Sequence, residues 1–69
     1  MIRYNKLFAL LALRGYKKTD LINLAAISSP TLAKLSRGDN ITTDVISKIC
    51  AALSCQPGDI MEWVPDESE

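Results

Sequence analysis

Histidine is missing from the 69-residue sequence, and only two cysteines are present. Without histidine, the chain has no imidazole base for Ser-His-Asp or Cys-His catalysis and no imidazole ligand for a metal ion. Two cysteines alone cannot supply the four ligands of a structural zinc site. The sequence therefore predicts that the protein is not an enzyme and that it holds neither a metal nor a cofactor.

Long apolar runs are also missing. The longest, Leu7–Leu13, has seven residues, whereas a membrane-spanning helix needs about 20. Lys6 directly precedes this run and no small-residue cleavage site follows it, so we expect no signal peptide. These absences predict a cytoplasmic protein without a membrane partner. In a reducing compartment, Cys50 and Cys55 are expected to be thiols that pack as small hydrophobic side chains, with a redox or metal pair as the minor alternative.

Net charge is absent too, because eight basic and eight acidic side chains cancel. The charges are nevertheless divided along the chain. Residues 1–38 carry seven basic side chains and one acidic, a net charge of +6, whereas residues 39–69 carry one basic and seven acidic, a net charge of −6. A basic half of this kind indicates an anionic partner, although solvated helix faces would give the same pattern.

A chain of this length allows a single domain, residues 1–69, in which only about 60% of the unfolded surface can be buried. Apolar spacing and turn residues predict an all-α domain of five short helices. The helices are expected at about residues 4–14, 17 or 18 to 25, 28–37 and 42–53, followed by a short helical turn from residue 56. Residues 2–4 and 62–64 could also pair as two brief strands, and the acidic end, 65–69, is expected to fray.

The third predicted helix has clear end signals. Ser28 is a suitable N-cap whose hydroxyl can accept from the backbone N–H of Thr31, and Pro30 falls in the first turn. Gly38 is placed to end the helix in a left-handed conformation. Two short helices that meet across a tight turn are typical of a helix-turn-helix. The shared apolar contacts are expected at Leu21, Ala25, Ile27, Leu32 and Leu35.

Residues 18–21 (KTDL), 27–35 (ISSPTLAKL) and Gly38 resemble the helix-turn-helix of the Cro/lambda-repressor-type (XRE) family. Residues 42–53 are similar to the family's fourth helix and residues 57–60 to its fifth, so the resemblance covers about residues 3–64. Within the family, the chain is most similar to the small stand-alone regulators, including the YozG-like and VanU-like proteins. The resemblance implies a compact five-helix lambda-repressor-like domain that regulates transcription by binding duplex DNA.

The resemblance also implies which residues would contact DNA. Lys18 and Thr19 match positions that touch phosphate, whereas the outward positions of the third helix reach base edges. Lys34 could pair with guanine O6 and N7, which is worth roughly 1–3 kcal/mol of discrimination. The complete predicted set is Lys17, Lys18, Thr19, Ser28, Ser29, Pro30, Thr31, Ala33, Lys34 and Arg37.

Two departures from the family pattern stand out. Ala26 occupies a position where the family often has glycine, so a left-handed backbone there would cost about 1 kcal/mol. The outward face of the third helix is poor in Asn, Gln and Arg.

The leading hypothesis is a sequence-specific regulator, a repressor, that binds as a homodimer and needs no small-molecule ligand. The alternative is a protein-interaction module, antitoxin-like or anti-repressor, that uses the same fold.

The dimer contact is predicted near the C-terminal end, where apolar residues follow the last helical turn. Ile60, Trp63 and Val64 are the interface candidates, because exposed aromatic side chains beside aliphatic ones favour interfaces. Trp63 could instead close the core of the monomer.

Overall fold

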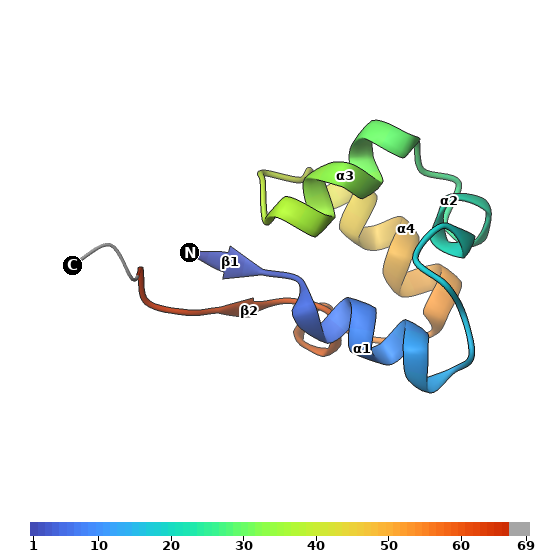
Figure 1. Ribbon diagram of the computed structural model, residues 1–69, viewed down its shortest axis with the longest axis horizontal. Coiled ribbons are helices and arrows are strands. Elements are labelled where there is room, and N and C mark those ends of the chain that lie inside the picture. Colours follow the sequence, from blue (N-terminus) through green and yellow to red (C-terminus); the bar gives the residue numbers. More distant parts are fainter. Residues whose placement is uncertain (67–69) are drawn as a thin grey trace.

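Four α-helices, one 3-10 turn and a two-stranded ribbon form the part of the chain that the computed structural model describes, residues 1–66 (Figure 1). Of the residues that were predicted to fray, 65–69, the last three lie outside the described residues. In chain order the elements are β1 (Ile2–Arg3), α1 (Asn5–Leu13), α2 (Asp20–Leu24), α3 (Ser29–Arg37), α4 (Thr43–Leu53), η1 (Pro57–Asp59) and β2 (Glu62–Trp63).

The prediction of five helices in an all-α domain is corrected at its C-terminal end. The segment from Gln56 forms only a 3-10 turn, η1, in which the Asp59 carboxylate accepts from the Gln56 backbone N–H at 2.9 Å. The chain then extends, because it pairs with the N-terminal segment. Strands β1 and β2 are antiparallel, with Ile2 opposite Trp63 and Arg3 opposite Glu62. The alternative expectation of two brief paired strands is thereby confirmed.

The predicted ends of α1, α3 and α4 agree with the structure to within about one residue, whereas α2 is shorter than predicted. Residues 17–19 form a turn rather than helix. The Asp20 N–H bonds to the Lys17 carbonyl at 3.1 Å, and the Asp20 carboxylate accepts from the Lys17 N–H at 2.8 Å. Because Asp20 holds this turn from its own side chain, regular α-helix begins only at Asp20.

Helix α3 has the caps that its sequence predicts. The Ser28 hydroxyl accepts from the Thr31 N–H at 3.2 Å, which satisfies one of the free donors of the first turn. Gly38 is left-handed, with φ 77°, and the Asp39 N–H returns to the Lys34 carbonyl at 2.9 Å. An added Cβ at Gly38 would lie 3.4 Å from the Ile2 carbonyl oxygen, an ordinary contact, so the positive φ rather than lack of space favours glycine here.

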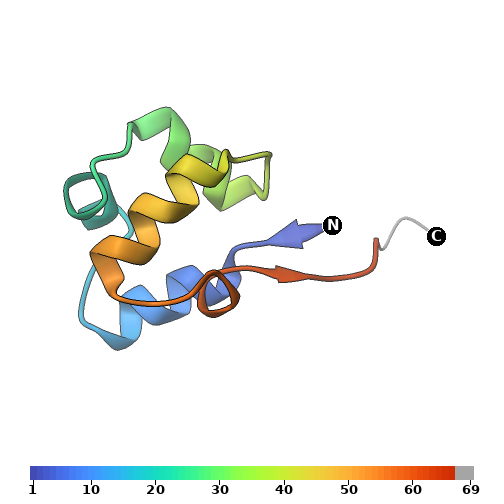
Figure 2. The ribbon, with the colours of Figure 1, turned by 180° about the vertical axis from the view of Figure 1, so that it is seen from behind.

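One core joins the elements. Every α-helix supplies a fully buried aliphatic side chain, and the segment after η1 supplies one more. Helix α4 runs between α3 on one side and α1 on the other, as both views show (Figures 1 and 2). Tyr4 joins the core at 5% exposure, and burial raises the pKa of its phenol. The fully buried residues are Leu7, Leu11, Leu21, Leu35, Ile49, Leu53 and Ile60.

Length and hydropathy also bear on membrane insertion. Among the residues that the structure describes, no helix is both long enough and apolar enough to cross a bilayer.

Candidate nucleic-acid interface

Helix α3 has an inner and an outer face. Leu35 is buried at 1% exposure and Leu32 is half-buried, so both anchor the helix to the core. The positions between them on the helix turn outward, and Ala33 and Lys34 are exposed. The helix lies at the edge of the molecule, on the far side of α4 from α1 (Figures 1 and 2). Its outer face is therefore not covered by any of residues 1–66.

The predicted DNA-contacting residues are almost all at the surface. Nine of the ten are exposed and Thr31 is half-buried. Three belong to the turn before α2, one is the N-cap of α3, and six lie in α3 itself. Helices α2 and α3 pack against each other directly. All ten predicted residues lie within residues 17–37, which we call the α2–α3 unit.

The connection between α2 and α3 determines how these two helices meet. Ala26 is left-handed, with φ 55°, and the Ile27 N–H returns to the Ile22 carbonyl at 3.2 Å. This is the hydrogen bond of a helix-ending turn that normally contains glycine. Ala26, the predicted departure from the family pattern, therefore has a strained backbone conformation. The packing of its buried neighbours Ala25 and Ile27 holds it in place.

The polar side chains of the α2–α3 unit differ in whether they already have a hydrogen-bond or ion-pair partner within the protein. Besides accepting from the Thr31 N–H, the Ser28 hydroxyl lies 2.9 Å from the Thr31 hydroxyl. The Arg37 guanidinium pairs with the Asp39 carboxylate at 2.8 Å, with both side chains largely exposed. Lys34 projects from the middle of the outer face. The Ser28 hydroxyl is therefore already used to cap α3, whereas the Lys34 and Arg37 side chains remain exposed.

Sequence reasoning missed two neighbours of these cations. The Lys18 ammonium lies 4.6 Å from the centroid of the Phe8 ring, so a residue of α1 supports the start of the helix-turn-helix. Phe8 lies ten positions before Lys18 in the chain, and nothing in the sequence links them. The Asp39 contact with Arg37 had a local signal, since opposite charges stand two residues apart next to a tight turn.

The structure also tests the dimer-interface candidates for exposure. Ile60 is 0% exposed, so its prediction as an interface residue is corrected: it fills the core of the monomer. Val64 is half-buried, and its N–H bonds to the Met1 carbonyl at 2.8 Å. Trp63 is 69% exposed, which excludes the alternative that it closes the monomer core.

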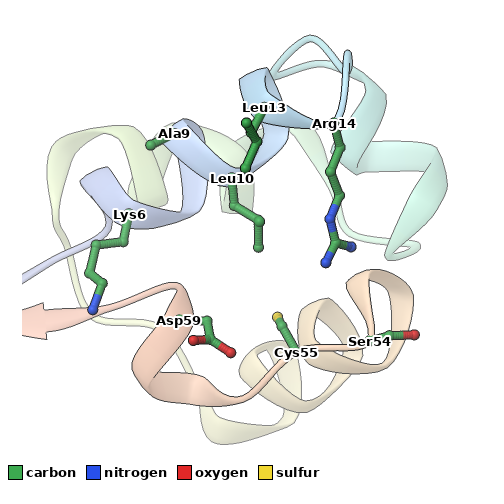
Figure 3. Close-up of a pocket in the computed structure, with 8 residues that line it drawn as sticks. All are labelled: Lys6, Ala9, Leu10, Leu13, Arg14, Ser54, Cys55 and Asp59. Atoms are coloured by element: carbon green, nitrogen blue, oxygen red, sulfur yellow. The ribbon is translucent and has the colours of Figure 1, made fainter.

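A groove lies on the side of the molecule that bears α1. It has a volume of about 490 Å³ and separates α1 from the C-terminal end of α4 and η1 (Figure 3). None of the predicted DNA-contacting residues lines it. Its walls are Lys6, Ala9, Leu10, Leu13, Arg14, Ser54, Cys55 and Asp59.

Comparison with known proteins agrees with this geometry. The sequence model of the Cro/C1-type HTH DNA-binding domain matches residues 6–66. The uncharacterized HTH-type transcriptional regulator YozG of Bacillus subtilis (strain 168) is 38% identical over 60 residues, which cover 84% of this chain and 71% of YozG. The crystal structure of the transcriptional regulator VanUg superposes with a TM-score of 0.90 at 40% identity, covering 94% of this chain and 87% of that one.

Proposed function

The chain belongs to the Cro/C1-type HTH DNA-binding domain family, and from that premise we propose that it is a sequence-specific repressor that inserts α3 into the major groove of duplex DNA as a homodimer. The observation that carries the proposal is the two-sided character of α3. Its inner face is anchored by Leu35, whereas its outer face, with Ser29, Ala33 and Lys34, is exposed. A major groove about 12 Å wide admits such a helix.

The surface residues divide by the contacts they can make. Lys34 has the length and charge to reach guanine O6 and N7, and Ala33 and Pro30 offer apolar contact to a thymine methyl. Lys17, Lys18, Thr19 and Arg37 are assigned to phosphates, which fix the register of the protein on DNA without reading sequence. Arg37 would exchange its exposed pair with Asp39 for a phosphate.

The small size of the surface on one protomer supports the proposal of a homodimer. A single module of this kind buries roughly 600–1,000 Å² on DNA. Two copies on half-sites about 34 Å apart would double the contact. Trp63 is the residue that we assign to the subunit contact, because a largely exposed tryptophan is a frequent interface anchor.

The test compares three lysine variants on DNA sites selected from a random pool by the purified protein. Lys34→Ala is expected to lose about 1–3 kcal/mol of discrimination at one base position, because the base contact disappears. Lys18→Ala is expected to weaken binding to all sequences alike. Lys48→Ala is the matched control, since Lys48 is an exposed lysine on α4 that pairs with Asp44 at 3.6 Å. Unchanged binding by both Lys34→Ala and Lys18→Ala would refute this assignment of the surface.

Repression is tested separately. Once a selected site is known, in vitro transcription from a promoter that contains it is expected to fall as protein is added. A rise in transcript would assign the protein as an activator instead.

A second function is favoured by the apolar surface around α1. Leu13 is 83% exposed beside the groove described above, and an exposed leucine next to a concavity suits a protein partner. A protein-interaction module of this type would pass through a heparin column at low salt, whereas a DNA-binding protein would be retained.

A further inference from the structure

The C-terminal end of α4 brings the two cysteines of the chain together. Ser54 is left-handed, with φ 52°, and the Cys55 N–H donates to the Cys50 carbonyl at 3.0 Å. This six-residue turn places Cys50 and Cys55 at the two positions whose side chains pack against each other when a helix ends in this way. The contact is usually made by ordinary hydrophobic side chains, and here both partners are thiols.

The backbone geometry suits a covalent bond between them. One carbonyl group, one 3.0 Å hydrogen bond and one N–Cα bond separate the two Cα atoms, which therefore lie less than about 7 Å apart. A disulfide requires roughly 4.4–6.8 Å. Burial is the main reason that the pKa of the Cys55 thiol is raised, and the proximity of the Cys50 thiol adds to it.

Both thiols are within reach of a small reagent. Cys50 and Cys55 are half-buried rather than buried, and both line a hollow of about 480 Å³ beside Gln56 and Met61. Cys55 also lines the groove under α1, where its sulfur points into the open space (Figure 3). A metal explains the pair less well, since residues 1–66 contain no cluster of three His, Cys, Asp or Glu side chains.

We propose that Cys50 and Cys55 form a reversible intrachain disulfide, with a low-molecular-weight disulfide such as glutathione disulfide as the oxidant. The Cys55 thiolate attacks one sulfur of glutathione disulfide, which breaks that S–S bond, forms a mixed disulfide and releases one glutathione. The Cys50 thiolate then attacks the Cys55 sulfur and releases the second glutathione. Two protein thiols are oxidised, one glutathione disulfide is reduced to two glutathiones, and the thiol protons pass to the leaving thiolates.

The proposal concerns a site remote in sequence from α3 and does not depend on DNA binding. The disulfide would join the last turn of α4 to the segment that precedes η1, next to the Leu53 carbonyl that accepts from the Arg14 guanidinium. It would hold together two pieces of chain that the folded structure already keeps in contact.

The test is a redox titration of the whole protein with glutathione and glutathione disulfide, read by mass spectrometry after alkylation of free thiols. The product expected is a monomer that has lost two hydrogens and carries no glutathione. The same titration in concentrated guanidinium chloride measures the effective concentration of the two thiols in the unfolded chain. If folding brings the thiols together, the equilibrium constant for disulfide formation in the folded protein exceeds the unfolded value by about tenfold or more.

The single-cysteine variants Cys50→Ala and Cys55→Ala complete the test. Each is expected to stop at a mixed disulfide with glutathione, and Cys55 is expected to form it faster because it borders both openings. The proposal is overturned if the wild-type protein accumulates glutathione adducts or disulfide-linked pairs of chains, fails to react, or has an equilibrium constant no larger folded than unfolded. These readouts on the wild-type protein do not require the variants to fold.

Discussion

At the scale of single residues, backbone conformation singles out two positions. Ala26 and Ser54 are the non-glycine residues with positive φ among residues 1–66. Each sits where a helix ends and the next residue returns a hydrogen bond to the helix. A Cβ in that region costs about 1–2 kcal/mol, so the chain tolerates strain at two of its turns.

Ala26→Gly should therefore raise the free energy of unfolding. Relief of the left-handed strain is partly offset by the greater entropy of glycine in the unfolded chain, which leaves a net gain of about 0.5–1 kcal/mol. Thermal unfolding should show a midpoint higher by roughly 2–8 °C. Ala33→Gly is the control, because α3 has ordinary helical backbone there, and it should lose about 1 kcal/mol. A lower midpoint for Ala26→Gly would contradict the argument.

The raised pKa of Cys55 predicts a particular pH dependence of its reactivity. Burial is the largest cause, Cys50 and Asp59 add to it, and Arg14 acts in the opposite direction. Because the thiolate is the reactive form, alkylation of Cys55 at neutral pH should be slower than that of an exposed cysteine, and its rate should go on rising at alkaline pH where an exposed cysteine has levelled off. Cys50→Ala removes two of the causes and should speed the reaction. Peptide mapping after timed alkylation measures both rates.

At the scale of elements, N-capping by nearby side chains explains why the first residues of α3 and α4 could be predicted. Ser28 and Thr42 each accept from the backbone N–H three residues later, at 3.2 and 3.3 Å. Because both hydrogen bonds join residues only three positions apart, they can be predicted from the sequence alone. The start of α2 differs from the prediction because the Asp20 carboxylate accepts from the Lys17 N–H and holds residues 17–20 in a turn.

Ser28→Ala should destabilise the protein by about 1 kcal/mol, since it leaves the Thr31 N–H without its side-chain acceptor. Chemical denaturation should show a lower midpoint with an unchanged slope. Ser36→Ala is the matched control: Ser36 is an exposed serine within the same helix, where alanine is the better helix former. Equal losses for both variants would show that the N-cap has no special contribution.

At the scale of the whole molecule, the division of charge has a measurable consequence. Lys17, Lys18 and Arg37, the three cations assigned to phosphates, are all exposed. If each of them displaces counterions from one phosphate, the logarithm of the binding constant should fall with the logarithm of salt concentration with a slope of roughly −3 per protomer. Fluorescence anisotropy across a salt series measures this slope. A slope near zero would contradict a phosphate-binding role for the three cations.

Most of what the sequence did not predict is non-local, the exceptions being the turn at residues 17–20 and the Arg37–Asp39 pair. Residues 62 and 63 form a strand because they pair with residues 2 and 3, some 60 positions away, so the sequence offered this pairing only as a possibility beside the helices. The contact between Lys18 and Phe8 and the burial of Ile60 have the same origin. The surface of α3, by contrast, could be listed in advance, because helical spacing decides which residues turn away from Leu35.

Burial of Ile60 also sets the smallest fragment that can fold alone. This side chain reaches the centre of the protein from beyond the last α-helix. A fragment cut after Leu53 would retain the entire helix-turn-helix, yet it would have an unfilled hole where Ile60 belongs. We therefore expect that the helix-turn-helix does not fold as an independent unit. A chimaera that carries it into another protein would also need residues that fill the position of Ile60.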